Sequence, residues 1–248
     1  MDVWPSHVND LAINLLASAI AGTAVWLSQW LVRVRRLARL RAFFGVLAGS
    51  SCIVAVSRHA ASSHSMSVHR RDVAAVVEVA TLLRQCGASA DVLVTDADLR
   101  GVGETTEFCI GGPSTNRRTA AHLSKFVPGL TIDSHETDPD GLTLRLAGRA
   151  FRRVPGVEEF ALVFRIPIKV GAKRPLWIIC GQTARSNHAA ARYLNAESRT
   201  LIRRFGRQPG FCLALKVINP TIYDHRYVEL AGTFEHTQFT MASTTTES

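Results

Sequence analysis

The sequence predicts an α/β protein with one N-terminal transmembrane helix. The domain that follows is expected to hold a mostly parallel sheet with an antiparallel hairpin addition. Three observations support this fold class. An uncharged apolar run, Leu11–Val32, lies near the start of the chain. Short apolar runs then alternate with helical segments, and two strand-to-helix connections repeat one pattern of glycine, hydroxyl residues and asparagine.

The run Leu11–Val32 is long enough to cross a bilayer. It has no charged residue, and it exceeds the about 20 residues that a helix needs to span the hydrocarbon core. Cleaved signal peptides carry positive charge before the apolar run. Here Asp2 and Asp10 precede it, so cleavage is not expected. A buried core helix and an interfacial helix are the alternatives, and the length and continuity of the run favour a span over both.

Basic residues on one side of the span predict its orientation. The arginines that follow the run are Arg33, Arg35, Arg36, Arg39 and Arg41. Because Lys and Arg stay cytoplasmic, we expect a single-pass protein of the inner (plasma) membrane with its N-terminus outside. We expect the five arginines to contact anionic lipid head groups. They account for part of the net charge of +9, and nucleic acid is an unlikely partner because no basic stripe with interleaved aromatics follows.

Five cysteines lie at positions 52, 86, 109, 180 and 212, and all except Cys86 sit in apolar strand-like runs, where they are expected to be small buried hydrophobic residues. Their number is odd and no CxxC pair occurs, which favours a reducing compartment and speaks against a metal site. We therefore expect no metal and no cofactor.

The chain divides into five predicted segments. They are a short extracytoplasmic N-terminus (1–10), the transmembrane helix (11–32), a basic juxtamembrane helix or linker (33–50), a cytosolic α/β domain (51–239) and a disordered tail (240–248). Within the domain, strands are predicted at 51–57, 90–95, 107–110, 176–180, 211–218 and 227–234. Helices are predicted at 71–86, 117–126 and 188–205. Alternating segments at 142–151 and 159–170 flank Pro155-Gly156 and predict the hairpin.

Two connections predict a binding site for an anion. Each runs from a buried strand through glycine and hydroxyl residues to an asparagine suited to cap the next helix. Helix N-termini expose N–H groups and a partial positive charge, so they attract anions. With the loop after the first strand, they give the predicted ligand-binding residues: Ser57, Arg58, His59, Gly111, Gly112, Ser114, Thr115, Asn116, Gly181, Gln182, Thr183, Arg185 and Asn187. Ordinary helix capping is the alternative, and neither turn matches a P-loop or GxGxxG motif.

Candidate catalytic residues are fewer. Glu104 and Glu107 are possible carboxylates near the pocket, and His59 is a possible proton carrier. His59, His64 and His69 fall in one loop, and their alternative interpretation is that all three are solvated loop residues. Asp96 and Asp98 follow a strand and could contact a ribose hydroxyl, and His188 could touch a ligand from the first turn of a helix.

The span Leu11–Val32 together with the loops Gly111–Asn116 and Gly181–Asn187 resembles membrane-anchored prokaryotic nucleotide-sensing effectors of antiviral defence. Those proteins join a membrane helix to a Rossmann-like CARF or SAVED domain. The resemblance implies a homo-oligomer that binds a nucleotide second messenger and changes membrane permeability. Small residues at Ala17, Ser18, Ala21 and Gly22 would let neighbouring spans pack closely.

Three functions remain open. The first is a membrane-anchored sensor of an anionic nucleotide-type ligand, which we favour. The second is a membrane-tethered hydrolase or glycosyl-transferring enzyme acting on a nucleotide or nucleoside, for which no decisive catalytic motif is present. The third is an anchored protein-interaction module.

Overall fold

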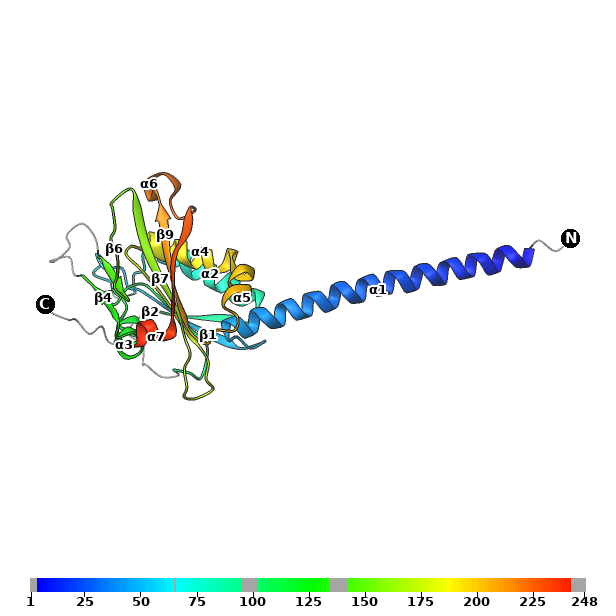
Figure 1. The fold of residues 1–248 in the computed structure, drawn as a ribbon, viewed down its shortest axis with the longest axis horizontal. Helices are drawn as coiled ribbons and strands as arrows, with labels where there is room; N and C mark the ends of the chain where they lie inside the picture. Colours follow the sequence, from blue (N-terminus) through cyan, green and yellow to red (C-terminus); the bar gives the residue numbers. More distant parts are fainter. Residues whose placement is uncertain (1–3, 65, 95–101, 134–141, 242–248) are drawn as a thin grey trace. The chain divides into compact units, whose positions relative to one another are not determined.

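The computed structural model describes residues 4–64, 66–94, 102–133 and 142–241, with side chains from residue 15 onward (Figure 1). The chain forms two compact units, Met1–Leu40 and Arg41–Ser248, and each is described by itself. The α/β class is confirmed, with one long apolar helix, a seven-stranded mixed sheet and a three-stranded antiparallel sheet.

Helix α1 (Trp4–Phe44) contains the predicted span and continues through the basic segment without a break. Its part Leu15–Phe44 is apolar enough to cross a membrane. None of its most apolar stretch is buried inside the molecule, which sets this helix apart from the core helix of a soluble domain. Arg33, Arg35, Arg36 and Arg39 are exposed. Arg41 differs, because its Nε donates to the Cys86 carbonyl at 2.7 Å.

The main sheet has the strand order β10-β9-β7-β8-β3-β1-β2. Five strands run in one direction, and β7 and β10 run against them. Their bounds are β1 (Ser51–Val56), β2 (Ser89–Val94), β3 (Glu107–Ile110), β7 (Glu158–Ile166), β8 (Leu176–Gly181), β9 (Phe211–Ile218) and β10 (Val228–Glu235). The predicted strands match these bounds to within a residue or so.

The predicted hairpin is wrong. Residues 142–151 fold back on themselves as β5 (Leu144–Leu146) and β6 (Arg149–Phe151), which form the second sheet with β4 (Leu130–Ile132). Ala147 and Gly148 both have positive φ, 49° and 75°, as a tight two-residue hairpin turn requires. Strand β7 pairs instead with β8 and β9 in the interior of the main sheet, so it is no edge addition.

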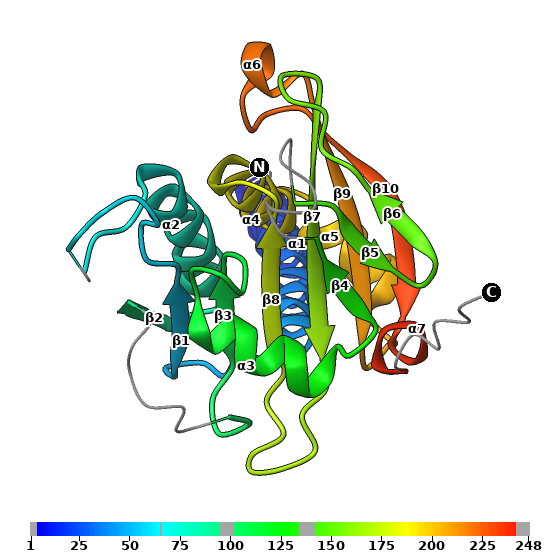
Figure 2. The same cartoon turned by 90° about the vertical axis from the view of Figure 1, so that its left-hand side faces the viewer.

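Helices cover both faces of the main sheet (Figure 2). On one face lie α2 (Arg70–Gln85), α4 (Ala184–Ala196) and α5 (Ser198–Phe205). On the other lie α3 (Arg117–Phe126), the second sheet and α7 (His236–Thr240), while α6 (Pro220–Tyr223) is a single turn before β10. The single helix predicted at 188–205 is wrong. The structure has two helices there, α4 and α5, which are separated at Glu197, and α4 begins earlier, at Ala184.

Successive strand residues point to opposite faces of the main sheet, so alternate residues fill the core on each face. Leu176, Ile178 and Cys180 of β8 belong to the core under the second sheet. Trp177, between them, packs against Phe44 at the end of α1, with 5.1 Å between the ring centroids. The Trp177 indole donates to the Phe44 carbonyl at 3.3 Å, so the last turn of α1 is built into the domain core. All five cysteines are buried and free, which confirms the burial expected for Cys52, Cys109, Cys180 and Cys212 and adds Cys86 to them.

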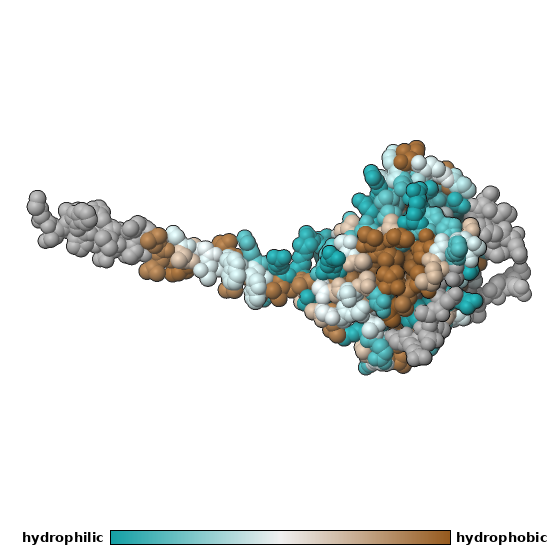
Figure 3. Space-filling model, turned by 180° about the vertical axis from the view of Figure 1, so that it is seen from behind, coloured by the Kyte–Doolittle hydropathy of each residue, from teal (hydrophilic) through white to brown (hydrophobic). Residues whose placement is uncertain are grey.

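One face of the domain has an exposed apolar surface, formed by α2 and the edge strand β2 (Figure 3). Val73 and Val77 on α2 and Val92 on β2 are each about half exposed (47%, 58% and 46%).

Candidate functional site

The loops after β1, β3 and β8 meet at one edge of the main sheet. These strands are adjacent and parallel, so their carboxyl ends lie together. From β1 the chain crosses to β2 on one side, and β3 lies on the other. Such a switch in strand order leaves a crevice beyond the carboxyl ends, where ligands of open α/β sheets bind.

A cavity of about 300 Å³ lies at this edge. Ten of the thirteen predicted ligand-binding residues line it: Ser57, Arg58, His59, Gly112, Ser114, Thr115, Gly181, Gln182, Thr183 and Asn187. The remaining three, Gly111, Asn116 and Arg185, do not line it. The cavity is within the size range of small-molecule sites, about 300–1,000 Å³.

Gly111 and Asn116 shape the cavity from behind. Gly111 has φ +109°, and a Cβ there would lie 1.6 Å from Ser57 Oγ, so only glycine lets the two loops approach. Asn116 is fully buried and caps α3, since its Oδ1 accepts from Thr119 N at 3.0 Å. Its Nδ2 donates to the carbonyls of Ala55 (3.3 Å) and Ile110 (3.2 Å), which ties α3 to β1 and β3.

Asn187 is not the N-cap of its helix, contrary to the sequence interpretation. Thr183 caps α4 through a capping box with Ser186, and Asn187 lies in the first turn. Its Oδ1 accepts from Gly181 N at 2.8 Å, and its Nδ2 donates to Asp72 Oδ1 at 3.0 Å. The reciprocal hydrogen bonds of Thr183 and Ser186 satisfy helix-start N–H groups, so the helix begins earlier than predicted.

Three helices begin at the cavity. Its lining includes His69, the N-cap of α2, Thr183, the N-cap of α4, and Thr115, which precedes the N-cap of α3. Each helix start adds a partial positive charge of about half an elementary charge. Arg58, also in the lining, adds a full one. The electrostatics of these groups favour an anion.

Asp72, His59 and His69 form a group of titratable side chains in the lining of the cavity. Asp72 is only 5% exposed, and its burial raises the pKa of the carboxyl, against the Asn187 hydrogen bond and the nearby His69 and His59, which lower it. The rings of His59 and His69 stack with 5.3 Å between centroids. His59 Nδ1 is buried and, among the described residues, has no hydrogen-bond partner.

Sequence reasoning missed the roles of Asp72 and His69. His69 is not a solvated loop residue, because its Nδ1 accepts from Arg71 N at 3.2 Å and caps α2. Asp72 belongs to the helix predicted after the first strand. An acidic residue in the first turn of a helix, at the carboxyl edge of the sheet, is the sequence pattern that could have indicated its role. His64 is exposed, as expected.

A smaller cavity of about 220 Å³ adjoins the first and shares His69, Thr183 and Ala184 with it. Its further lining consists of Arg71, Arg153, Glu159 and Arg185. Thr183 Oγ1 donates to the buried Glu159 carboxylate at 2.5 Å, and Arg185 lies 3.4 Å from it. Asp224 pairs with both Arg71 and Arg185. The predicted ligand residue Arg185 is thus part of an ion-pair network beside the main cavity.

Glu107 and Glu104 do not lie near the main cavity, which corrects their assignment. Glu107 is the first residue of β3, about 10 Å along the strand from its carboxyl end. It is 2% exposed, and Arg118 donates to both of its carboxylate oxygens. Burial would raise the pKa of Glu107, but the hydrogen bonds and charges of Arg118 and His122 outweigh burial and lower it to about 2. Glu104, nearby in the chain, is exposed.

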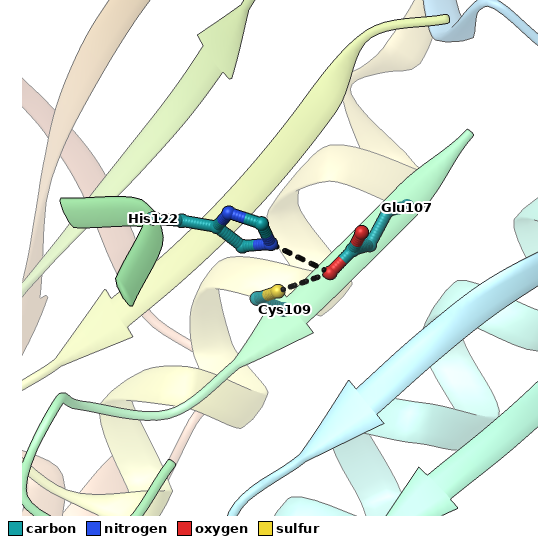
Figure 4. Close-up of side chains that lie close together, drawn as sticks. All are labelled: Glu107, Cys109 and His122. Carbon is teal, nitrogen blue, oxygen red and sulfur yellow. Dashed lines mark hydrogen bonds and ion pairs between the residues drawn. The ribbon is translucent and has the colours of Figure 1, made fainter. Parts of the chain in front are cut away.

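Glu107, Cys109 and His122 place their potential metal-ligand atoms within 4.8 Å of one another (Figure 4). His122 Nε2 is 3.0 Å and Cys109 Sγ 3.1 Å from Glu107 Oε1. The donor set does not suit a metal, because the Arg118 guanidinium already occupies the carboxylate. Burial also raises the pKa of Cys109 well above its ordinary value, and metals bind the thiolate. The cluster is a buried ion pair.

Two further sequence candidates do not join the cavity. His188 stacks on His225 with 3.8 Å between ring centroids, outside the lining. Asp96 and Asp98 fall outside the described residues.

The chain matches no protein-family model, and comparison with curated proteins and with solved structures also finds no match.

Proposed function

We propose that the protein is a membrane-anchored sensor whose α/β domain binds an anionic, nucleotide-type ligand in the 300 Å³ cavity. The observation that carries the proposal is the meeting of three helix starts, those of α2, α3 and α4, at one cavity. Backbone N–H groups at helix starts bind phosphate without any special side chain.

The surrounding charges support the same class of ligand. Arg58 lines the cavity, and Arg71, Arg153 and Arg185 line the smaller one beside it. Glu159 and Asp224 balance part of this charge through the ion pairs with these arginines. A ligand with more than one phosphate could reach both cavities, since they share three residues.

A route for a signal runs along β3 and β8. Their carboxyl ends lead into the cavity loops, and Phe108 and Trp177 near their amino ends are paired partners in register. Both rings pack against Phe44, the last residue of α1. A ligand that binds one arrangement of these loops better than another would thereby bias the end of the helix.

The resemblance to nucleotide-sensing effectors supplies the rest of the proposal. This remaining part of the proposal comprises a Rossmann-like domain, a homo-oligomer at the plasma membrane, and a role in antiviral defence. In an oligomer, the small residues of α1 from Ala17 to Gly22 are the proposed contacts between spans.

Thermal unfolding of the full-length protein in detergent tests the binding proposal. A panel of linear and cyclic nucleotides is added, and the Tm is measured. A ligand at 100 times its Kd stabilises the folded protein by about 2.7 kcal/mol, which gives a clear shift. Arg58→Ala is expected to weaken binding, whereas Arg207→Ala, at an exposed arginine outside both cavities, is the matched control. No shift with any nucleotide would refute the proposal.

A nucleotide-processing enzyme is the second candidate, favoured by His59 and Asp72 in the same cavity. Incubation of the full-length protein with the nucleotides that shift its Tm, followed by chromatography, separates the two functions. Product formed by wild type and abolished in His59→Gln would favour the enzyme, while unchanged nucleotide favours the sensor.

A further inference from the structure

We infer that Asp72 accepts a hydrogen bond from the ribose 2′-hydroxyl of the ligand, and so makes the cavity selective for ribonucleotides. The inference rests on the proposed function, because it concerns the same cavity. It adds the residue that would set specificity and the sugar that it would recognise.

The position of Asp72 is fixed from two sides. It lies in the first turn of α2, where its backbone N–H donates to the His69 carbonyl at 2.8 Å. Asn187, from the first turn of α4, donates to its Oδ1 at 3.0 Å. The carboxylate is therefore held between two helices whose starts line the cavity, in a preorganised position.

Asp72 has one oxygen left for a ligand. The residue is 5% exposed and yet lines the cavity, so what remains accessible faces that space. In the described part of the chain, the hydrogen bond from Asn187 reaches Oδ1, and Oδ2 receives none. A buried carboxylate without enough donors is costly, which makes an incoming donor favourable.

The charge of Asp72 decides which part of the ligand it faces. A carboxylate repels phosphate, so the phosphate must lie away from Asp72, at lining residues such as Arg58 and Ser114, which supply a charge and a hydroxyl donor. The part of the ligand that faces Asp72 must be an uncharged hydrogen-bond donor. A ribonucleotide has both groups within one small molecule, whereas inorganic phosphate has no sugar hydroxyl, and its own P–OH belongs to the charged group that Asp72 repels. Carboxylates accept from ribose hydroxyls in dinucleotide sites by the same chemistry.

Matched ribonucleotide and 2′-deoxyribonucleotide pairs test the inference on the full-length protein in detergent. The probes are the four 5′-monophosphate pairs, cyclic dinucleotide pairs, and inorganic phosphate, with Kd taken from Tm titrations. Wild type is expected to bind the ribo form of its preferred ligand at least about tenfold tighter, since loss of a hydrogen bond to a charged group costs about 1.5–3 kcal/mol.

The variant Asp72→Asn keeps the size of the side chain and removes the charge. It is expected to bring ribo and deoxy affinities within about twofold of each other, while affinity for phosphate is kept or increased because the repulsion is gone. Asp91→Asn, at an exposed aspartate of β2, is the control and should keep the full preference.

The outcomes separate this inference from the proposed function. If nucleotides bind and wild type does not distinguish ribo from deoxy, the inference is overturned and the sensor proposal stands; this result needs no variant. A preference retained in folded Asp72→Asn also overturns it. If no nucleotide binds at all, the proposed function fails and the inference fails with it.

Discussion

At the scale of single residues, Glu107 shows how a buried charge can look like a catalytic group in the sequence. Its carboxylate pairs with Arg118 and His122 at the amino end of β3. We predict that Glu107→Gln lowers the free energy of unfolding by about 3–5 kcal/mol, because it removes the carboxylate that pairs with the buried Arg118 guanidinium. Denaturant unfolding of the detergent-solubilised protein, followed by tryptophan fluorescence, measures the change.

Glu104→Gln is the control for this variant. Glu104 lies at the same end of the sheet and is exposed, so its substitution should change stability by no more than about 0.5 kcal/mol. Equal effects of the two substitutions would contradict the ion-pair assignment.

The lowered pKa of Glu107 also predicts how stability depends on pH. Its pKa falls from an ordinary value of 4.5 to about 2 in the folded protein. The stabilisation is therefore complete above about pH 4.5 and is lost as the pH falls toward 2. Between these values, wild type should lose stability more steeply than Glu107→Gln. Parallel curves for the two proteins would show that Glu107 does not titrate in this range.

Gly111 and Gly112 offer a matched pair of substitutions beside the cavity. Alanine at 111 would place a Cβ 1.6 Å from Ser57 Oγ at a φ of +109°, whereas alanine at 112 meets nothing within 4 Å. We predict that Gly111→Ala costs about 2 kcal/mol or more and weakens nucleotide binding, and that Gly112→Ala leaves stability nearly unchanged. Tm and nucleotide titrations measure both effects, and similar Tm values for the two variants would contradict the close approach of the loops.

At the scale of elements, local signals were sufficient where they agreed with tertiary packing. The helix predicted at 117–126 and the strand at 211–218 have the observed bounds. The hairpin prediction failed because it took Pro155-Gly156 as the turn and overlooked Ala147-Gly148. Alternation of apolar residues is the same for an edge hairpin and for separate strands, so the sequence alone could not assign β7 to the sheet interior.

The end of α1 links the helix part that is apolar enough to span a membrane to the domain core. Phe44 is fully buried against Trp177 and Phe108. We predict that Phe44→Ala destabilises the domain by about 3–5 kcal/mol, since it leaves a cavity in the aromatic core. Leu47→Ala, at a residue 52% exposed, should have little effect. Denaturant unfolding measures both, and a small loss in Phe44→Ala would show that the helix end is not part of the core.

At the scale of the whole molecule, the sequence predicted which loops meet at the cavity but not which distant side chains pair with Asp72 and Glu107. Residues of three separate loops were predicted to share an edge, and strand order alone brings them there. The role of Asp72 depends on Asn187, which is 115 residues away in the chain. The burial of Glu107 likewise depends on how α3 packs over β3. Such pairings arise from tertiary structure, and no local pattern in the sequence indicates them.

The orientation of the chain in the membrane is the prediction that concerns the whole molecule. Arg33, Arg35, Arg36 and Arg39 follow the apolar run, which should keep the domain in the cytoplasm. The native cysteines are all buried, so Ser63→Cys, at an exposed position, gives the domain an accessible thiol. In intact bacterial cells this thiol should resist a membrane-impermeant maleimide and react only after permeabilisation.

Replacement of the four arginines by alanine, with Asp2→Lys and Asp10→Lys, moves the positive charge to the other side of the span and should expose Ser63→Cys to the reagent in intact cells. If the maleimide labels Ser63→Cys in intact cells while the four arginines are unchanged, the domain lies outside, where a sensor of cytosolic nucleotides could not work.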